Sequence, residues 1–168
     1  MGTPIPMLDL MFFLTESVEN PRHVGALLVF ERPKATRTDF VGRVVESFRR
    51  AVPVAPFNRV PVFRKAGLPE WHEAGALDMD WHVQRLALPA PGSESRLHEL
   101  VAKLHEPLLE RDRPGWRIFV IDGLERDRFA EEARDVATTR EHDAADAHRR
   151  RDRVDERCEG RRFERPDL

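Results

Sequence analysis

The chain has 168 residues, of which 40% are hydrophobic and 35% charged, and its formal net charge is −2 at pH 7. That length suits one domain or part of a larger one, and the near-neutral charge excludes a general attraction to nucleic acid or anionic lipid. The single cysteine, Cys158, excludes a disulfide framework and a zinc site built from several cysteines. No apolar run reaches the roughly 20 residues of a membrane-spanning helix, and the start lacks the basic residues of a secretion signal. We therefore expect a cytoplasmic protein.

Composition divides the chain near Ala130. Residues 131–168 hold 12 acidic residues and 10 arginines among 38 positions, with few large apolar side chains. Such a segment cannot bury enough apolar surface to offset the entropy lost on ordering. We predict a globular part over residues 1–130 and a disordered or helical charged tail over residues 131–168.

The first predicted elements are a short helix, a strand and a longer helix. Leu8–Leu14 is apolar and follows two prolines, which favours a helical turn or two. The unbroken apolar run Val24–Phe30 is typical of a strand covered on both faces. A helix then begins at Thr38 or Asp39, because apolar residues recur at helical spacing from Phe40 to Phe48.

Three short strands are predicted next, followed by a second helix. Val60–Arg64 and Glu70–Glu73 are joined through a glycine, and Asp80–Leu88 alternates as a strand does, with Trp81 and Val83 on one face. The second helix begins after Ser93 or Ser95 and carries an apolar stripe. The stripe consists of Leu97, Leu100, Val101, Leu104 and Leu108.

The last predicted elements are strands. Trp116–Ile121 has the composition of a buried strand, and Arg128–Ala130 begins another. The resulting order, β-α-β-β-β-α-β, predicts an α/β fold, an α+β sandwich in which helices pack on a mixed sheet.

Several blocks in this order resemble the amino-terminal region of the bacterial wax ester synthase/diacylglycerol acyltransferase family. The resemblance covers roughly residues 5–130. The blocks are Leu8–Leu14, Asn20–Leu27 (Asn-Pro-Arg-His-Val-Gly-Ala-Leu), Leu77–Val83 with Ala87–Gly92, Leu104–Leu108 through Arg113–Trp116, and Ile121–Leu124.

The resemblance implies one partial lobe of a chloramphenicol-acetyltransferase-like, CoA-dependent acyltransferase fold. In that fold two α/β lobes enclose a tunnel where acyl-CoA, as co-substrate, meets diacylglycerol or a fatty alcohol, in triacylglycerol or wax ester biosynthesis. The family's catalytic element, His-His-x-x-x-Asp-Gly, follows the strand that Arg128–Ala130 begins. Its second histidine is the general base, a role suited to imidazole because its pKa lies near working pH. No metal and no further cofactor are implied.

The chain departs from the family at that element, because it contains no His-His pair. The nearest match, Glu141–Ala147, would make His142 the base and Asp146 its structural partner. We favour a chance match, because residues 131–140 are charged where a buried strand should lead into the element. We interpret the tail as the product of a disrupted, mispredicted or frame-shifted gene, and we expect a truncated family member that is inactive alone.

Other candidate residues have structural interpretations. The histidines His23, His72, His82, His98 and His105 are scattered singly, without metal-ligand spacing, and His82 is expected to serve packing. The tryptophans Trp71, Trp81 and Trp116 are expected in the core at strand positions. By the family resemblance, Trp116 is a candidate tunnel-side residue for substrate binding, beside Gly115, where the family commonly has leucine.

Two alternatives to an acyltransferase remain. A partial lobe leaves apolar surface uncovered, which favours a non-catalytic interaction module that associates with a full-length relative or a lipid surface, peripherally at a membrane or lipid body. The other alternative is a chain that never folds stably. The arginine clusters of the tail are interleaved with acids, so nucleic acid is not an expected partner.

Overall fold

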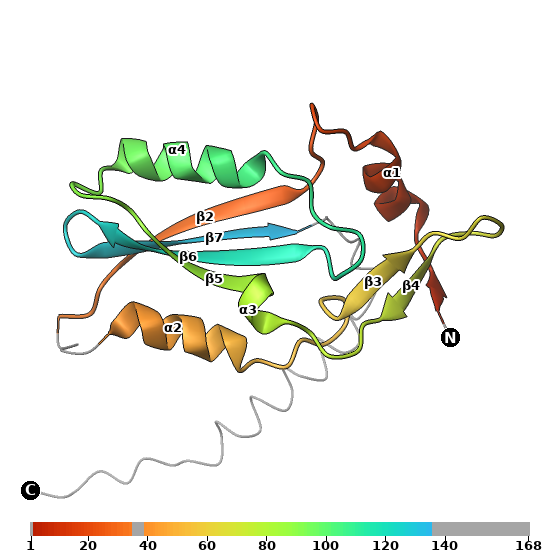
Figure 1. The fold of residues 1–168 in the computed structure, drawn as a ribbon, viewed down its shortest axis with the longest axis horizontal. Helices are drawn as coiled ribbons and strands as arrows, with labels where there is room; N and C mark the ends of the chain where they lie inside the picture. Colours follow the sequence, from red (N-terminus) through yellow and green to blue (C-terminus); the bar gives the residue numbers. More distant parts are fainter. Residues whose placement is uncertain (1, 35–38, 136–168) are drawn as a thin grey trace, which may run out of the picture. The chain divides into compact units, whose positions relative to one another are not determined.

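The computed structural model describes residues 2–34 and 39–135, which form two sheets and four helices (Figure 1). The helices are α1 (Met7–Thr15), α2 (Phe40–Arg49), α3 (Met79–His82) and α4 (Glu94–His105). The strands are β1 (Thr3–Pro4), β2 (Val24–Glu31), β3 (Arg59–Val62), β4 (Glu70–Glu73), β5 (Val83–Ala87), β6 (Trp116–Leu124) and β7 (Arg128–Asp135). The predicted mixed α/β fold is confirmed.

The larger sheet has the strand order β2-β7-β6-β5, with α4 on one face and α2 on the other (Figure 1). Only β5 and β6 run parallel; the other pairs are antiparallel. Because successive side chains of a strand point to opposite faces, β6 supplies both cores. Val120 packs with Val41 and Val45 of α2, whereas Phe119 and Ile121 pack with Leu97 of α4.

Both long helices begin at the capping residues that the sequence offers. The Asp39 carboxylate accepts a hydrogen bond from the Gly42 amide at 3.0 Å at the start of α2. The Ser93 hydroxyl accepts one from the Arg96 amide at 3.4 Å at the start of α4. Each cap satisfies an amide that has no partner within its own helix.

The smaller sheet has the order β1-β4-β3 and packs against α1. Phe13 of α1 meets Trp71 of β4 edge to face, with ring centroids 5.8 Å apart, and Ile5 and Leu109 complete the cluster. The Arg111 guanidinium donates to the Phe13 carbonyl at 2.9 Å and pairs with Glu16 at 3.1 Å. Within residues 2–34 and 39–135, no helix is long and apolar enough to span a membrane.

The prediction that Val24–Phe30 is covered on both faces is wrong. The strand forms, but β2 is an edge strand that pairs only with β7, and seven of its eight residues are exposed. Leu28 is 53% exposed and Val29 is 46% exposed. The run has the composition of a strand with both faces buried, but in the described part of the chain most of its side chains are exposed.

The prediction of a strand over Asp80–Leu88 is wrong in its first half. Residues 79–82 form the short helix α3, which Asp78 caps by accepting from the Trp81 amide at 3.1 Å, and the strand begins only at Val83. Trp81 therefore lies on a helical turn and is partly exposed rather than in the core. The guanidinium groups of Arg113 and Arg117 lie 4.4 Å from the centre of its ring.

The compositional boundary at Ala130 falls inside a strand. β7 continues to Asp135, and Glu132 and Arg134 are buried within it at 0% and 3% exposure. The expectation that the charge of residues 131–140 excludes a buried strand is thus wrong for residues 131–135. Pairing on both sides, with β2 and with β6, holds this charged segment in the centre of the sheet.

Candidate functional site

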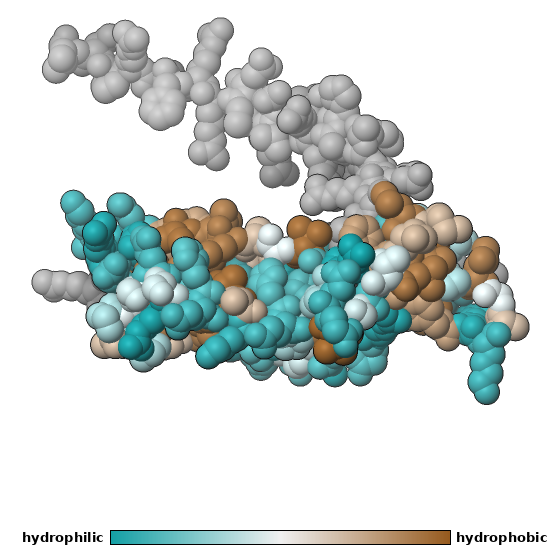
Figure 2. Space-filling view, turned by 90° about the horizontal axis from the view of Figure 1, so that it is seen from above, coloured by the Kyte–Doolittle hydropathy of each residue, from teal (hydrophilic) through white to brown (hydrophobic). Residues whose placement is uncertain are grey.

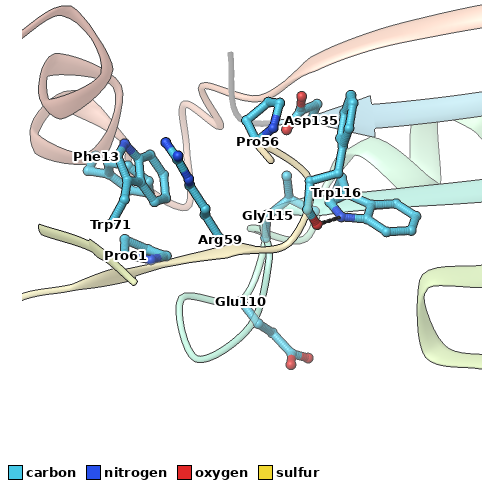
Figure 3. A pocket seen from close by; sticks show the side chains of 11 residues that line it. Phe13, Pro56, Arg59, Pro61, Trp71, Glu110, Gly115, Trp116 and Asp135 are labelled. Carbon is cyan, nitrogen blue, oxygen red and sulfur yellow. Dashed lines mark hydrogen bonds between the residues drawn. The ribbon is translucent and has the colours of Figure 1, made fainter. Parts of the chain in front are cut away.

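A pocket opens where β6 starts and β7 ends, next to the smaller sheet (Figure 3). Its cavity volume is about 20 Å³, and it opens to solvent. Its lining is mainly aromatic and proline side chains, with one guanidinium and two carboxylates among them. The lining residues are Phe13, Pro56, Phe57, Arg59, Pro61, Trp71, Leu109, Glu110, Gly115, Trp116 and Asp135.

Trp116 forms a fixed wall of this pocket. Its indole Nε1 donates a hydrogen bond to the Phe57 carbonyl at 2.7 Å, and the side chain is only 8% exposed. On its inner side the ring stacks on His82, with centroids 4.2 Å apart and planes inclined by 25°. The indole therefore has both a hydrogen-bond partner and a stacked neighbour, as buried tryptophan side chains usually do.

His82 packs against Trp116 and supports its position. Its Nδ1 lies 2.8 Å from the Trp116 carbonyl, and the residue is 1% exposed. Burial lowers the pKa of His82, with the hydrogen bond to the Trp116 carbonyl opposing that shift, so the imidazole is neutral near pH 7. The packing role expected for His82 is confirmed.

The end of β7 meets the pocket directly. Asp135, the last residue of β7, stands opposite Trp116 in the β6–β7 ladder, and both residues line the pocket (Figure 3). The last described residue of the chain therefore lies at the pocket. The weak candidates His142 and Asp146 lie outside the described residues, as does Cys158.

A buried polar cluster beneath α4 was not expected from the sequence. His105 Nε2 lies 2.6 Å from a carboxylate oxygen of Glu132, and the rings of His105 and His23 lie 5.1 Å apart. The Arg134 guanidinium donates to the carbonyl groups of Leu104 and Pro107. The sequence does not indicate this contact between His23 and His105, because the charge pattern of residues 131–135 does not predict the strand β7 that brings the cluster together.

Burial dominates the electrostatics of this cluster. It raises the pKa of Glu132, while the nearby charges of His105 and Arg134 oppose that shift. Burial, helped by the charge of Arg134, lowers the pKa of His23 to about 4. In the described part of the chain no three His, Cys, Asp or Glu side chains converge as a metal site would require.

Comparison with known proteins assigns the family. The model for the wax ester synthase/diacylglycerol acyltransferase catalytic domain matches residues 5–133, which is most of the chain. The chain belongs to this family. The resemblance inferred from the sequence blocks is confirmed, and the family match ends inside β7.

Curated relatives include three acyltransferases of Mycobacterium tuberculosis. The chain is 38% identical over 128 residues to the probable diacylglycerol O-acyltransferase Tgs4, which covers 76% of the chain and 27% of Tgs4. It is 40% identical over 130 residues to tgs2, a match that covers 73% of the chain and 28% of tgs2. It is 36% identical over 133 residues to tgs3, a match that covers 77% of the chain and 48% of tgs3. The chain thus spans between about a quarter and a half of their lengths.

Solved structures carry the same fold. The wax ester synthase/diacylglycerol acyltransferase from Marinobacter aquaeolei VT8 matches with a TM-score of 0.75 and 32% identity, over 90% of this chain and 38% of that one. The X-domain in its complex with OxyB from teicoplanin biosynthesis matches in fold alone, with a TM-score of 0.56 and 18% identity over 80% of this chain and 28% of that chain. The acyltransferase family has the chloramphenicol-acetyltransferase-like fold that the resemblance implies.

Proposed function

We propose that this family member contributes one wall of an acyl-transfer site, where acyl-CoA meets diacylglycerol or a fatty alcohol. The observation that carries the proposal is the pocket beside Trp116 and Asp135, at the end of β7. In the family, the His-His-x-x-x-Asp-Gly element follows the strand that β7 represents. A base delivered from that point would act at this pocket.

The reaction needs a base that the described lining does not supply. The acceptor hydroxyl must lose its proton as its oxygen attacks the thioester carbonyl, and the CoA sulfur then leaves. Among the described lining residues there is no histidine, and the two carboxylates are those of Glu110 and Asp135. We propose that the chain alone does not turn over, since loss of a general base costs about 10²- to 10⁴-fold in rate.

An acyl-transfer assay tests this proposal. Purified full-length protein is incubated with palmitoyl-CoA and diacylglycerol, and with palmitoyl-CoA and hexadecanol, and ester formation is measured. We expect no ester above background. Turnover abolished by His142→Ala or Asp146→Ala, but retained by a His98→Ala control on the exposed side of α4, would contradict the inactivity and restore the degenerate element as a catalytic one.

A second candidate function is favoured by exposed apolar side chains. On α1, Met7, Leu8 and Leu14 are 70%, 57% and 65% exposed, although the helix packs through Phe13. Figure 2 shows hydrophobic side chains gathered over the end of the molecule that holds α1. Edge strand β2 adds Leu28 and its apolar neighbours. Such surface suits a non-catalytic module in the cytoplasm that docks on a full-length relative or peripherally on a lipid surface.

Docking is tested with two defined partners. Sedimentation of the chain with purified tgs2 and flotation with diacylglycerol-containing phosphatidylcholine vesicles are compared for wild type, Leu28→Glu and Leu14→Glu. Association lost in a variant supports the module and locates the surface. A wild-type chain that sediments as a monomer and floats with no vesicle would exclude it.

A further inference from the structure

Arg59 is the cation of the pocket, and its position follows from the strand pairing. It is the first residue of β3, two residues before Pro61, so both side chains point to the same face of the sheet. Pro61 pairs with Trp71, and that face is the one that packs against Phe13. In Figure 3 the Arg59 side chain extends between Trp71 and Phe13 on one side and Pro56 on the other.

The guanidinium of Arg59 has no ionic partner among the residues that the structure describes. Glu73 lies directly opposite in the β3–β4 ladder, the usual place for a cross-strand ion pair, yet the two side chains form none. A neighbour shows the contrast: Arg64, after β3, pairs with Glu70 at 3.1 Å. Of the two carboxylates in the pocket lining, that of Glu110 is already paired with Arg113 at 2.7 Å.

A half-buried, unpaired guanidinium among aromatic side chains indicates a site for a negative group. Its planar donors match a phosphate with two parallel hydrogen bonds, and the apolar surroundings strengthen such a contact by excluding water. Of the substrates in the proposed function, diacylglycerol and fatty alcohols carry no charge. Acyl-CoA alone brings phosphate groups.

We propose that Arg59 is a binding residue for a phosphate group of the acyl-CoA donor, an inference that rests on the proposed function. The aromatic lining of the pocket then contacts the uncharged part of the same molecule. Arg59 holds the donor, and the neutral acceptor gains nothing from it. The residue therefore distinguishes donor from acceptor, because it is the one cation among the described lining residues.

Ligand binding to the full chain tests this role without requiring turnover. Isothermal titration is performed with octanoyl-CoA, free CoA and octanoyl-pantetheine, which lacks phosphate, on wild type, Arg59→Gln and the matched control Arg64→Gln. We expect Arg59→Gln to weaken octanoyl-CoA and free CoA by about tenfold or more, the usual range for a charge-assisted hydrogen bond. Octanoyl-pantetheine should bind to Arg59→Gln as tightly as it binds to wild type. The Arg64→Gln variant should bind octanoyl-CoA and free CoA as wild type does.

Salt dependence separates this role from a structural one. Between 50 and about 200 mM salt, wild type should lose affinity for octanoyl-CoA more steeply than Arg59→Gln, because screening acts on the ion pair. Either of two results overturns the assignment of Arg59 and leaves the proposed function standing. In the first, Arg59→Gln loses as much affinity for octanoyl-pantetheine as for octanoyl-CoA; in the second, it binds octanoyl-CoA as tightly as wild type does. Wild-type protein that binds none of the three ligands overturns the proposed function as well.

Discussion

The two faces of the larger sheet are built differently. Beneath α2 the packed cluster is mainly apolar, from Val41 and Val45 to Val120 and Phe129, with the neutral His82 stacked on Trp116 at one end. Beneath α4 an apolar half around Leu97 and Phe119 gives way to the charged cluster of His105, Glu132 and Arg134. Burial of apolar side chains closes most of the first face, whereas the second also requires that buried charges find partners. The pocket lies at the end of the sheet where Trp116 belongs to the apolar face.

The largest effect is expected on the apolar face. Trp116→Ala should lower the free energy of unfolding by about 3–5 kcal/mol, the range for removal of a buried large aromatic side chain. Urea denaturation followed by circular dichroism measures the change. Trp81→Ala is the matched control and should cost less than half as much, because Trp81 is partly exposed on α3. Equal losses would contradict the core role of Trp116.

On the charged face beneath α4, removing two buried charges together should stabilise the fold, whereas Trp116→Ala on the other face should destabilise it. Glu132→Leu combined with Arg134→Met should raise the free energy of unfolding by about 1–4 kcal/mol, since apolar packing often outperforms a buried network of charged groups. In this network Glu132 contacts His105, and Arg134 donates to backbone carbonyl groups. Glu132→Leu alone should destabilise, because Arg134 then keeps a buried charge without its acidic neighbour. The double variant and the two single variants, Glu132→Leu and Arg134→Met, are compared by urea denaturation. A double variant less stable than either single one would show that the cluster stabilises the fold.

His23, on the charged face beneath α4, predicts that the stability of the fold depends on pH. The pKa of His23 is lowered to about 4 in the folded chain, while an unfolded histidine titrates near 6.5. Between these values the unfolded state binds the extra proton, so stability should fall as the pH drops from about 6.5 to 4. His23→Gln should flatten that part of the profile, measured by thermal unfolding at several pH values. A profile parallel to wild type would remove His23 as the cause.

The smallest effects compare the two helix starts. Asp39→Ala should cost about 0.5–2 kcal/mol, the usual range for a lost cap, and Ser93→Ala should fall at the low end because its hydrogen bond is longer, 3.4 Å against 3.0 Å. Asp39 also pairs with Arg85 at 2.6 Å, an exposed contact that adds little. Urea denaturation of both variants checks the order. A larger loss for Ser93→Ala would contradict it.

The sequence predicts the apolar face well because its signals are local. Helical spacing from Phe40 to Phe48, the cap at Asp39 and the buried run at Trp116 each lie within a few residues of one another. Trp116 lines the pocket, and its proposed contact with substrate, which comes from the family resemblance, stays a prediction.

The charged face could not be predicted, because its partners lie far apart in sequence. His105 and Glu132 are 27 residues apart, and their contact exists only once β7 pairs on both sides. Arg59 gave no signal either, since an arginine opposite a glutamate is usually an ion pair. Only the register and the missing contact with Glu73 single it out.

The central claim, that the pocket at the end of β7 holds the acyl donor, is tested most directly by photo-crosslinking. An octanoyl-CoA analogue with a terminal diazirine is irradiated with the full chain, and the modified residues are mapped by mass spectrometry. We predict adducts on the lining side chains around Trp116 and Phe13, suppressed by excess octanoyl-CoA. Adducts confined to the α4 face or to β2, or adducts that octanoyl-CoA does not suppress, would contradict the claim.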